Sequence, residues 1–96
     1  MGLSFILWYH EEVVRSDIPR LPSTIRVRIR RAIETRLATH PEQFGRPLRR
    51  SLHGYRKLRV GDYRVIFRIK GTMVKIFLIA HRSVVYRMSD KRIFMV

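Results

Sequence analysis

The hydrophobic pattern of this 96-residue chain changes its period near residue 45. Before that point apolar residues recur at helical spacing, whereas between residues 57 and 80 they alternate with polar residues or form a short continuous run. We therefore expect one N-terminal strand followed by helices in the first half of the chain. The second half predicts an antiparallel sheet.

The first half predicts one strand and two helices. Residues 4–9 are almost continuously apolar, which indicates a buried strand. A short helix over residues 10–15 should end before Pro19, because a proline disfavours the helical conformation in the residue before it. Pro22 suits the first turn of a second helix of about four to five turns. The buried stripe predicted for this helix consists of Ile25, Ile29, Ala32, Ile33 and Leu37.

The second half predicts three strands. Residues 57–60 and 63–70 alternate apolar and mostly cationic side chains around the turn dipeptide Gly61-Asp62, as in a β-hairpin. Residues 74–80 are more continuously apolar, which favours a central strand. The predicted fold is a single α+β domain, residues 1–96, in β-α-α-β-β-β order. It has an antiparallel, mixed-edge sheet with two N-terminal helices on one face, and the strand cations largely on the other.

The distribution of charge adds a functional prediction to this fold. The chain carries 21 Lys and Arg against 7 Asp and Glu, a formal net charge of +14. Between residues 46 and 75 ten cations accompany a single acid, Asp62. A solvated charged surface is the ordinary interpretation of basic strands, but here the acids that would neutralise it are missing. We therefore predict that the cationic sheet face binds a polyanion such as a nucleic acid.

Other classes of function find no support in the composition. The chain has no cysteine, which removes disulfides and thiolate chemistry and fits a cytoplasmic location. The run from residue 3 to residue 9 is too short to span a bilayer and lacks a preceding basic segment, so we expect no membrane association. The residues show no metal-ligand cluster, paired carboxylates or phosphate-binding loop, and we predict no metal and no cofactor.

Two segments carry a family resemblance. Residues 48–67, LRRSLHGYRKLRVGDYRVIF, and residues 81–86, HRSVVY, resemble the RelE/ParE superfamily of type II toxin–antitoxin toxins. The resemblance implies a RelE-like, microbial-RNase-type fold. For RelE-like members it implies a ribosome-dependent endonuclease that cleaves mRNA in the A site. The ribose 2′-hydroxyl attacks the adjacent phosphate without a metal. The implied partners are the ribosome, mRNA and an acidic antitoxin.

The resemblance also assigns roles to four residues. Arg64 aligns with the family's sheet arginine and is expected to stabilise the transition state, since a guanidinium fork suits phosphate oxygens. Arg82 corresponds to an arginine after the last long strand, for which we expect substrate binding. Tyr86 matches a tyrosine that stacks on a base or orients the attacking group. Lys57 matches a basic residue that activates the 2′-hydroxyl or holds the phosphate. Structural alternatives stay open: a cross-strand charge pair for Arg64 and packing under the C-terminal tail for Tyr86.

The proton-transfer residues are less determined. Tyr55 stands where some members have a further lysine. Histidine titrates near neutrality, so His81 is a candidate catalytic residue, with a structural role as its alternative, and His53 is a weaker one. Arg46 and five further arginines are predicted to contact ribosomal RNA or to supply steering charge, rather than to act as catalytic residues. Those five are Arg49, Arg50, Arg56, Arg59 and Arg68.

Two other functions remain compatible with these residues. The ParE branch shares the fold but inhibits DNA gyrase, which makes a protein-inhibiting module the main alternative. A member that binds RNA or the ribosome without cleaving would show steep salt dependence and leave mRNA intact.

Overall fold

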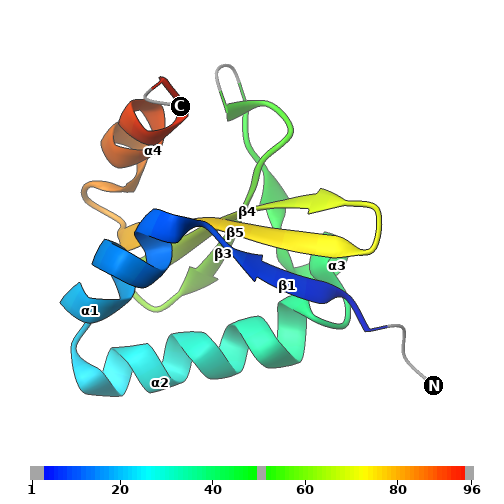
Figure 1. Cartoon of the computed structure of the whole chain (residues 1–96), viewed down its shortest axis with the longest axis horizontal. Coiled ribbons are helices and arrows are strands. Elements are labelled where there is room, and N and C mark those ends of the chain that lie inside the picture. The colour runs from blue at the N-terminus through cyan, green and yellow to red at the C-terminus, as the bar shows by residue number, and fades with distance from the viewer. Residues whose placement is uncertain (1–3, 50–51, 95–96) are drawn as a thin grey trace.

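A five-stranded mixed sheet forms the middle of the molecule (Figure 1). The computed structural model describes residues 4–49 and 52–94. The strands are β1 (Ile6–Tyr9), β2 (Arg46–Pro47), β3 (Arg56–Val60), β4 (Tyr63–Lys70) and β5 (Met73–His81). Their order is β1-β5-β4-β3-β2; β1 runs parallel to β5 and the other neighbours are antiparallel. The predicted hairpin and the predicted central place of the last strand are both confirmed.

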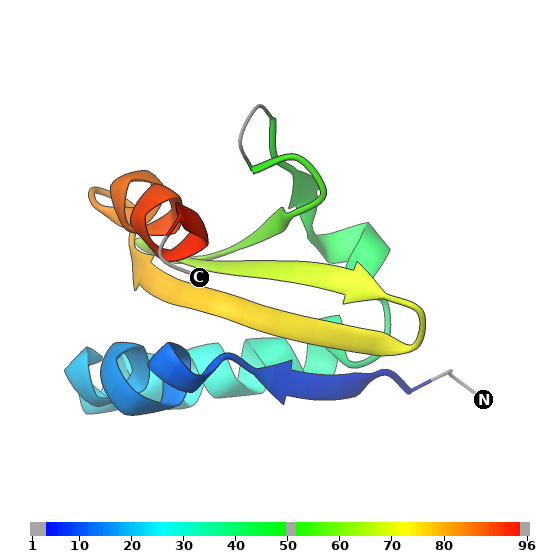
Figure 2. The same ribbon diagram turned by 45° about the horizontal axis from the view of Figure 1, so that its top comes forward.

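Helices lie on both sides of this sheet (Figure 2). They are η1 (Val13–Asp17), α1 (Ile18–Arg20), α2 (Ser23–Ala32), η2 (Ile33–Leu37), α3 (Pro41–Phe44) and α4 (Val85–Phe94), with η1 and η2 being π-helical. The α+β fold is confirmed, whereas the C-terminal helix α4 was not predicted. Within the described part of the chain, no helix is both long and apolar enough to cross a membrane.

The two faces of the sheet differ in what covers them. The helix face packs against α2 and η2, and its strand side chains are Leu58, Val60, Val65, Phe67, Val74 and Ile76. The cation face is the opposite one, and it carries Lys57, Arg59, Arg64, Ile66, Arg68 and Lys75. Helix α4 covers one end of the cation face (Figure 2). There Val85 and Met88 pack with Ile66. No helix among the described residues lies over the rest of that face (Figure 2).

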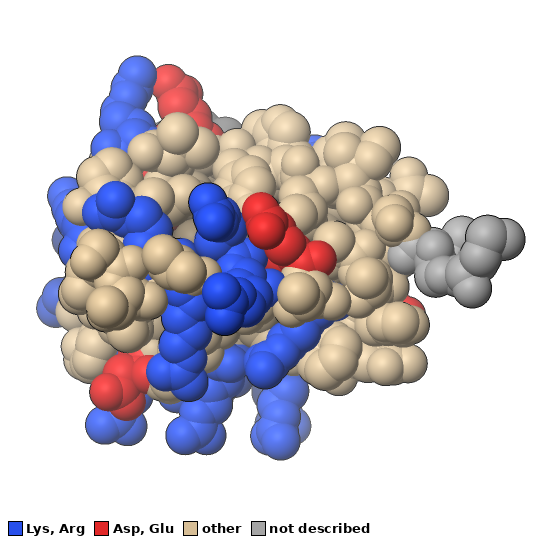
Figure 3. Space-filling model, turned by 90° about the horizontal axis from the view of Figure 1, so that it is seen from below, with Lys and Arg blue, Asp and Glu red and all other residues tan. Residues whose placement is uncertain are grey.

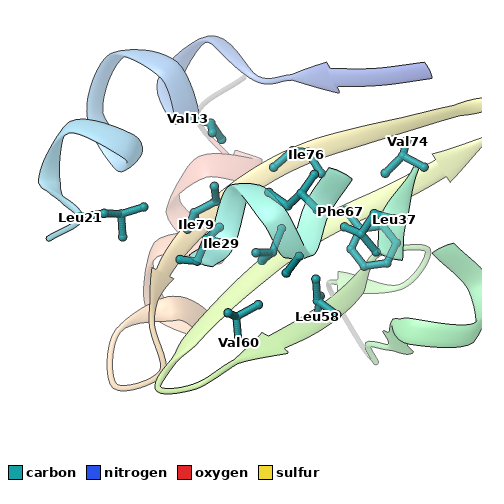
Figure 4. Packing of buried hydrophobic residues seen from close by; sticks show 13 residues of the cluster. Val13, Leu21, Ile29, Leu37, Leu58, Val60, Phe67, Val74, Ile76 and Ile79 are labelled. Carbon is teal, nitrogen blue, oxygen red and sulfur yellow. The ribbon is translucent and has the colours of Figure 1, made fainter. Parts of the chain in front are cut away.

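The core lies between α2 and the helix face (Figure 4). The predicted stripe is confirmed, because Ile29, Ile33 and Leu37 are at most 2% exposed. Phe67 is fully buried beneath them in β4. Period-two alternation thus turns one set of strand residues into the core and the other set outward.

Strand β1 departs from the prediction of a buried strand. It lies at an edge of the sheet, and Phe5, Leu7 and Tyr9 pack against the core while the alternate residues face outward. Ile6 is 61% exposed and Trp8 is 45% exposed. A continuous apolar run indicates burial on both faces, but here only the helix face is covered.

The first helix also departs from its prediction, because it continues through Pro19 to Arg20. Ile18, the residue before the proline, is helical, with φ −61° and ψ −46°. Its backbone N–H donates to the carbonyl of Val13, five residues earlier. We attribute the continuation to this π-helical turn, after which Pro19 occupies the first turn of α1, where its missing N–H costs little.

A buried ion pair ties this helix to α4. Arg92 donates to both carboxylate oxygens of Asp17, at 2.7 and 3.0 Å, and to the carbonyl of Phe77 at 3.0 Å. The Asp17 carboxylate also accepts the backbone N–H of Ile79 at 2.9 Å. Since β1 pairs with β5 only as far as Ile76, the two side chains provide hydrogen-bond partners where the neighbouring strand has ended.

Candidate functional site

A cationic hollow of about 300 Å³ opens on the cation face. Its lining residues are Phe44, Arg46, Lys57, Arg59 and Arg64, and no acid is among them. Strand pairing assembles it, because Arg46 in β2 lies opposite Lys57 in β3. Arg59 lies opposite Arg64 in β4. Like charges placed directly opposite each other destabilise a sheet. An anion seated among these four cations would remove that repulsion.

Arg64 is held in place by the turn that precedes it. Gly61 adopts φ +59°, a conformation that favours glycine, and the turn brings the chain back so that β4 pairs with β3. Nη1 of Arg64 donates to the carbonyls of Gly61 at 3.0 Å and Tyr63 at 2.9 Å. Within the described part of the chain neither Nη2 nor Nε donates to a protein acceptor, so both keep their N–H groups for a ligand. The alternative of a cross-strand pair with an acid is wrong, since the residues opposite are Arg59 and Ala80.

Lys57 and Tyr86 meet beside the hollow. Lys57 Nζ donates to Tyr86 Oη at 2.7 Å and lies 5.4 Å from the centre of the tyrosine ring. An ammonium group has no acceptor, so the tyrosine oxygen receives this hydrogen bond and its own O–H stays available to donate. Tyr86 lies in the first turn of α4 and is 44% exposed. The ring therefore presents surface to a ligand.

Arg82 lies beside the same hairpin turn. Its backbone N–H donates to the carbonyl of Asp62 at 2.8 Å, and its Nε lies 3.7 Å from the Asp62 carboxylate. Both side chains are well over half exposed, so this ion pair contributes little to stability. The backbone of Arg82 is thus held beside the turn that precedes Arg64, while its exposed side chain can still move toward a ligand.

His81 points away from the other predicted catalytic residues. Its ring packs edge-on against Tyr63, 5.4 Å between centres, and Tyr63 packs against the core of the helix face. Its Nδ1 accepts the backbone N–H of Ser83 at 3.1 Å and lies 2.8 Å from the Ser83 hydroxyl. A neutral ring therefore carries its proton on Nε2. His53 is exposed in the loop before β3.

The predicted RNA-contact arginines separate into groups. Arg59 lines the hollow, Arg68 lies on the cation face, and Arg49 is exposed in the loop between β2 and β3. Arg56 lies on the helix-face side of β3 and donates to the carbonyl of Gly45 at 3.0 Å. Arg50 lies outside the described residues.

A second basic surface lies on the opposite side of the molecule, on the outer side of α2 and η2. Figure 3 views the molecule from that side and shows blue Lys and Arg side chains gathered there with few red acids. Exposed arginines contributed by these two helices are Arg26, Arg28, Arg30, Arg31 and Arg36. Positive charge therefore surrounds more of the molecule than the strand pattern predicted.

A larger hollow, about 440 Å³, lies between the first helix and α2 and is lined mainly by apolar side chains. Burial there raises the pKa of Tyr9 above its ordinary value of 10.0; the negative charge of Glu34 adds to the rise and Arg30 opposes it. Across residues 4–49 and 52–94, no three His, Asp or Glu side chains are arranged to hold a metal ion. Of the predicted catalytic residues, Arg64 and Lys57 line the cationic hollow and Tyr86 meets Lys57 beside it.

Comparison with known proteins places the chain in a family. Residues 11–86 match the family model described as ParE toxin of type II toxin–antitoxin system, parDE. The toxin RelE of Mycobacterium tuberculosis is 36% identical over 89 residues, covering 88% of this chain and 92% of that toxin. The chain belongs to the RelE/ParE superfamily of type II toxin–antitoxin toxins. The toxin RelG of the same organism is 36% identical over 75 residues, covering 76% of this chain and 86% of that toxin.

Solved structures agree with this membership. A chain of the RelBE2 toxin–antitoxin complex of M. tuberculosis superposes with a TM-score of 0.78 at 30% identity, covering 84% of this chain and 94% of that chain. A chain of the RelB–RelE complex of Methanococcus jannaschii shares the fold, with a TM-score of 0.63 at 20% identity, covering 82% of this chain and 94% of that chain. The matched residues 11–86 contain the whole cationic hollow together with Arg82 and Tyr86.

Proposed function

We propose that this RelE/ParE toxin is an endoribonuclease of the RelE branch that cleaves mRNA in the ribosomal A site. The ribose 2′-hydroxyl loses its proton and attacks the adjacent phosphate, so that a 2′,3′-cyclic phosphate forms while the bond to the 5′-oxygen of the next nucleotide breaks and that oxygen takes up a proton. The observation that carries the proposal is the cationic hollow, in which Arg64 is fixed by two carbonyls beside the Lys57–Tyr86 hydrogen bond.

Arg64 is the proposed transition-state stabiliser. Attack on a phosphodiester places extra negative charge on the phosphate oxygens as the transition state forms. Donors already aimed at that position need no reorganisation when the charge develops, which is why preorganised groups stabilise it strongly. The two turn carbonyls hold the Arg64 guanidinium in one orientation, and Arg59 in β3 and Arg46 in β2 supply further positive charge to the hollow.

Lys57 and Tyr86 are proposed to act as a unit. With one N–H directed at Tyr86 Oη, the Lys57 ammonium keeps two further donors for phosphate oxygens. The Tyr86 hydroxyl donates toward the substrate, and its exposed ring stacks on an unpaired base. Arg82 binds the substrate from the neighbouring turn. His81, which packs against Tyr63, supports the turn after β5 in this proposal.

The partners follow from charge and family. We propose that the exposed arginines of α2 and η2 dock on ribosomal RNA, since phosphate contacts of this kind need no sequence-specific chemistry. A net charge of +14 also suits an acidic antitoxin that holds the toxin inactive. The RelBE2 and RelB–RelE relatives were solved as antitoxin complexes, which supports such a partner here. The proposed site of action is the cytoplasm.

Gyrase inhibition is the second candidate. The matching family model carries the ParE description, which favours that branch. The named relatives, RelE and RelG, favour the other. A gyrase inhibitor would slow DNA supercoiling by purified gyrase and leave mRNA intact.

Primer extension on an mRNA translated in vitro separates these functions. Purified toxin is added with and without ribosomes, and supercoiling by gyrase is measured in parallel. Cuts inside codons that require ribosomes are the expected result. Intact mRNA together with inhibited supercoiling would replace the proposal by the ParE-type activity, and ribosome binding without cuts would indicate a non-catalytic binder.

A further inference from the structure

A row of two aromatic and two cationic side chains crosses the cation face away from the hollow. In β1, Trp8 lies opposite Lys75 of β5, and Lys75 lies opposite Arg68 of β4. The Lys75 ammonium lies 5.5 Å from the centre of the Trp8 ring, and the Arg68 guanidinium lies 5.6 Å from that of Tyr55. We call Trp8, Lys75, Arg68 and Tyr55 the aromatic row.

A second line of ring contacts runs beside this row. Trp8 meets His10 edge-on at 6.3 Å, His10 meets Phe77 at 5.6 Å, and Phe77 meets Tyr55 at 5.0 Å between ring centres. Phe77 is 8% exposed, so it fills the space beneath the outer rings. These contacts support Trp8 and Tyr55 as fixed platforms at the two ends of the row.

The fold alone does not explain the row. Trp8 is 45% exposed and Ile6, on the same side of β1, is 61% exposed, so a patch of apolar surface lies uncovered at this edge of the sheet. Lys75 and Arg68 are like charges directly opposite each other, an unfavourable pairing without an anion between them. No acid occurs in β1, β3, β4 or β5 to neutralise them.

We infer that the aromatic row binds single-stranded RNA next to the catalytic hollow, with bases stacked on Trp8 and Tyr55 and phosphates held by Lys75 and Arg68. Aromatic rings interleaved with cations are the usual platform for unpaired nucleic acid, because every base offers a π-face and every link a phosphate. The inference rests on the proposed RNA substrate, and it extends the binding surface to Trp8, Tyr55 and Lys75.

The row and the hollow lie on one continuous path. Arg68 and Arg64 belong to the same strand, four residues apart on the same face, which corresponds to about 13 Å along β4. A few nucleotides of extended RNA span that distance. The row therefore holds the chain on one side of the phosphate that is cleaved.

The chain's single tryptophan makes the test direct. Trp8 fluorescence is titrated with a 2′-O-methyl oligonucleotide, which resists 2′-hydroxyl cleavage, in the absence of ribosomes. We expect saturable quenching that weakens with salt.

Binding of a labelled oligonucleotide to Trp8→Leu or Tyr55→Leu should be weaker by roughly 5- to 100-fold, the loss of one stacking ring. Lys75→Gln should reduce the slope of log affinity against log salt by about 0.7. Arg15→Gln, which removes one exposed charge from the first helix, is the matched control and should change neither.

The outcomes separate the row from the proposed activity. A poly-glutamate peptide that quenches Trp8 while the oligonucleotide does not would overturn the inference and make the row a docking surface for an acidic protein. No response to either also overturns it, and in that case ribosome-dependent cleavage still tests the hollow. On ribosomes, Trp8→Leu should raise KM with kcat unchanged. Unchanged KM and oligonucleotide affinity in both aromatic variants would contradict the inference.

Discussion

The helix face and the cation face belong to the same strands yet follow opposite chemistry. On the helix face Phe67 and Ile76 are fully buried under α2, so their contribution is the removal of apolar surface from water. On the cation face Arg64 lies opposite Arg59, and Arg68 lies opposite Lys75. One face is arranged for stability, whereas the other accepts electrostatic repulsion. Substitutions on the helix face should therefore lower the free energy of unfolding, whereas substitutions on the cation face should weaken RNA binding or cleavage.

The largest effect on stability is expected from Phe67→Ala. The ring is fully buried, and truncating such a residue costs about 3–5 kcal/mol in lost transfer energy and cavity formation. Urea unfolding followed by circular dichroism measures the change. Arg59→Ala is the matched variant on the cation face and should stay within about 0.5 kcal/mol of wild type. Equal losses of unfolding free energy in the two variants would contradict the view that the helix face provides stability and the cation face does not.

Arg92→Met tests the ion pair that joins α4 to the first helix. The change leaves the buried Asp17 carboxylate without its cation, which typically costs about 3–5 kcal/mol. Because Tyr86 lies on the same helix, the contact with Lys57 should loosen as well. Arg87→Met, at an exposed position of α4, is the control. An unfolding midpoint equal to that of Arg87→Met would show that the pair does not anchor the helix.

A smaller effect is expected at Tyr9 in alkaline solution. Its raised pKa means that the unfolded chain loses the phenolic proton first as the pH rises above 10.0. The contribution of the neutral phenol is therefore fully present below that pH and is lost as the pH rises through the folded-state pKa. Tyr9→Phe removes this loss, so its free energy of unfolding should fall less steeply above pH 10.0 than that of wild type. Parallel pH profiles would exclude the effect.

The parts of the fold that were predicted rest on local patterns. The stripe from Ile25 to Leu37 and the alternation around Gly61 each need only neighbouring residues, and both were confirmed. Helix α4 was missed because its stabilising contacts lie far away in sequence: Arg92 pairs with Asp17, 75 residues earlier. Exposure of Trp8 was missed because an apolar run does not show whether an edge strand is covered on one face or two.

In the candidate site, too, the predicted features rest on local patterns and the missed ones depend on contacts between distant segments. Lys57 and Arg64 share a face by simple alternation, so their proximity was predictable. Alternation also places His81 with Ile79 and Tyr63 on the helix face, a signal that was present but outweighed by the family resemblance. Phe44 joins the hollow only through the pairing of the two-residue strand β2, which no local pattern indicates.

The central claim is that the cation face performs RNA cleavage through Arg64. The most direct test is the single-turnover rate of mRNA cleavage on programmed ribosomes at saturating toxin, for wild type and Arg64→Ala. Arg15→Ala, which removes an exposed arginine of the first helix, is the control. We expect Arg64→Ala to cleave about 10²–10³-fold more slowly, the loss typical of one transition-state donor, with its unfolding midpoint unchanged. A rate equal to that of Arg15→Ala, or no cleavage by wild type, would contradict the account.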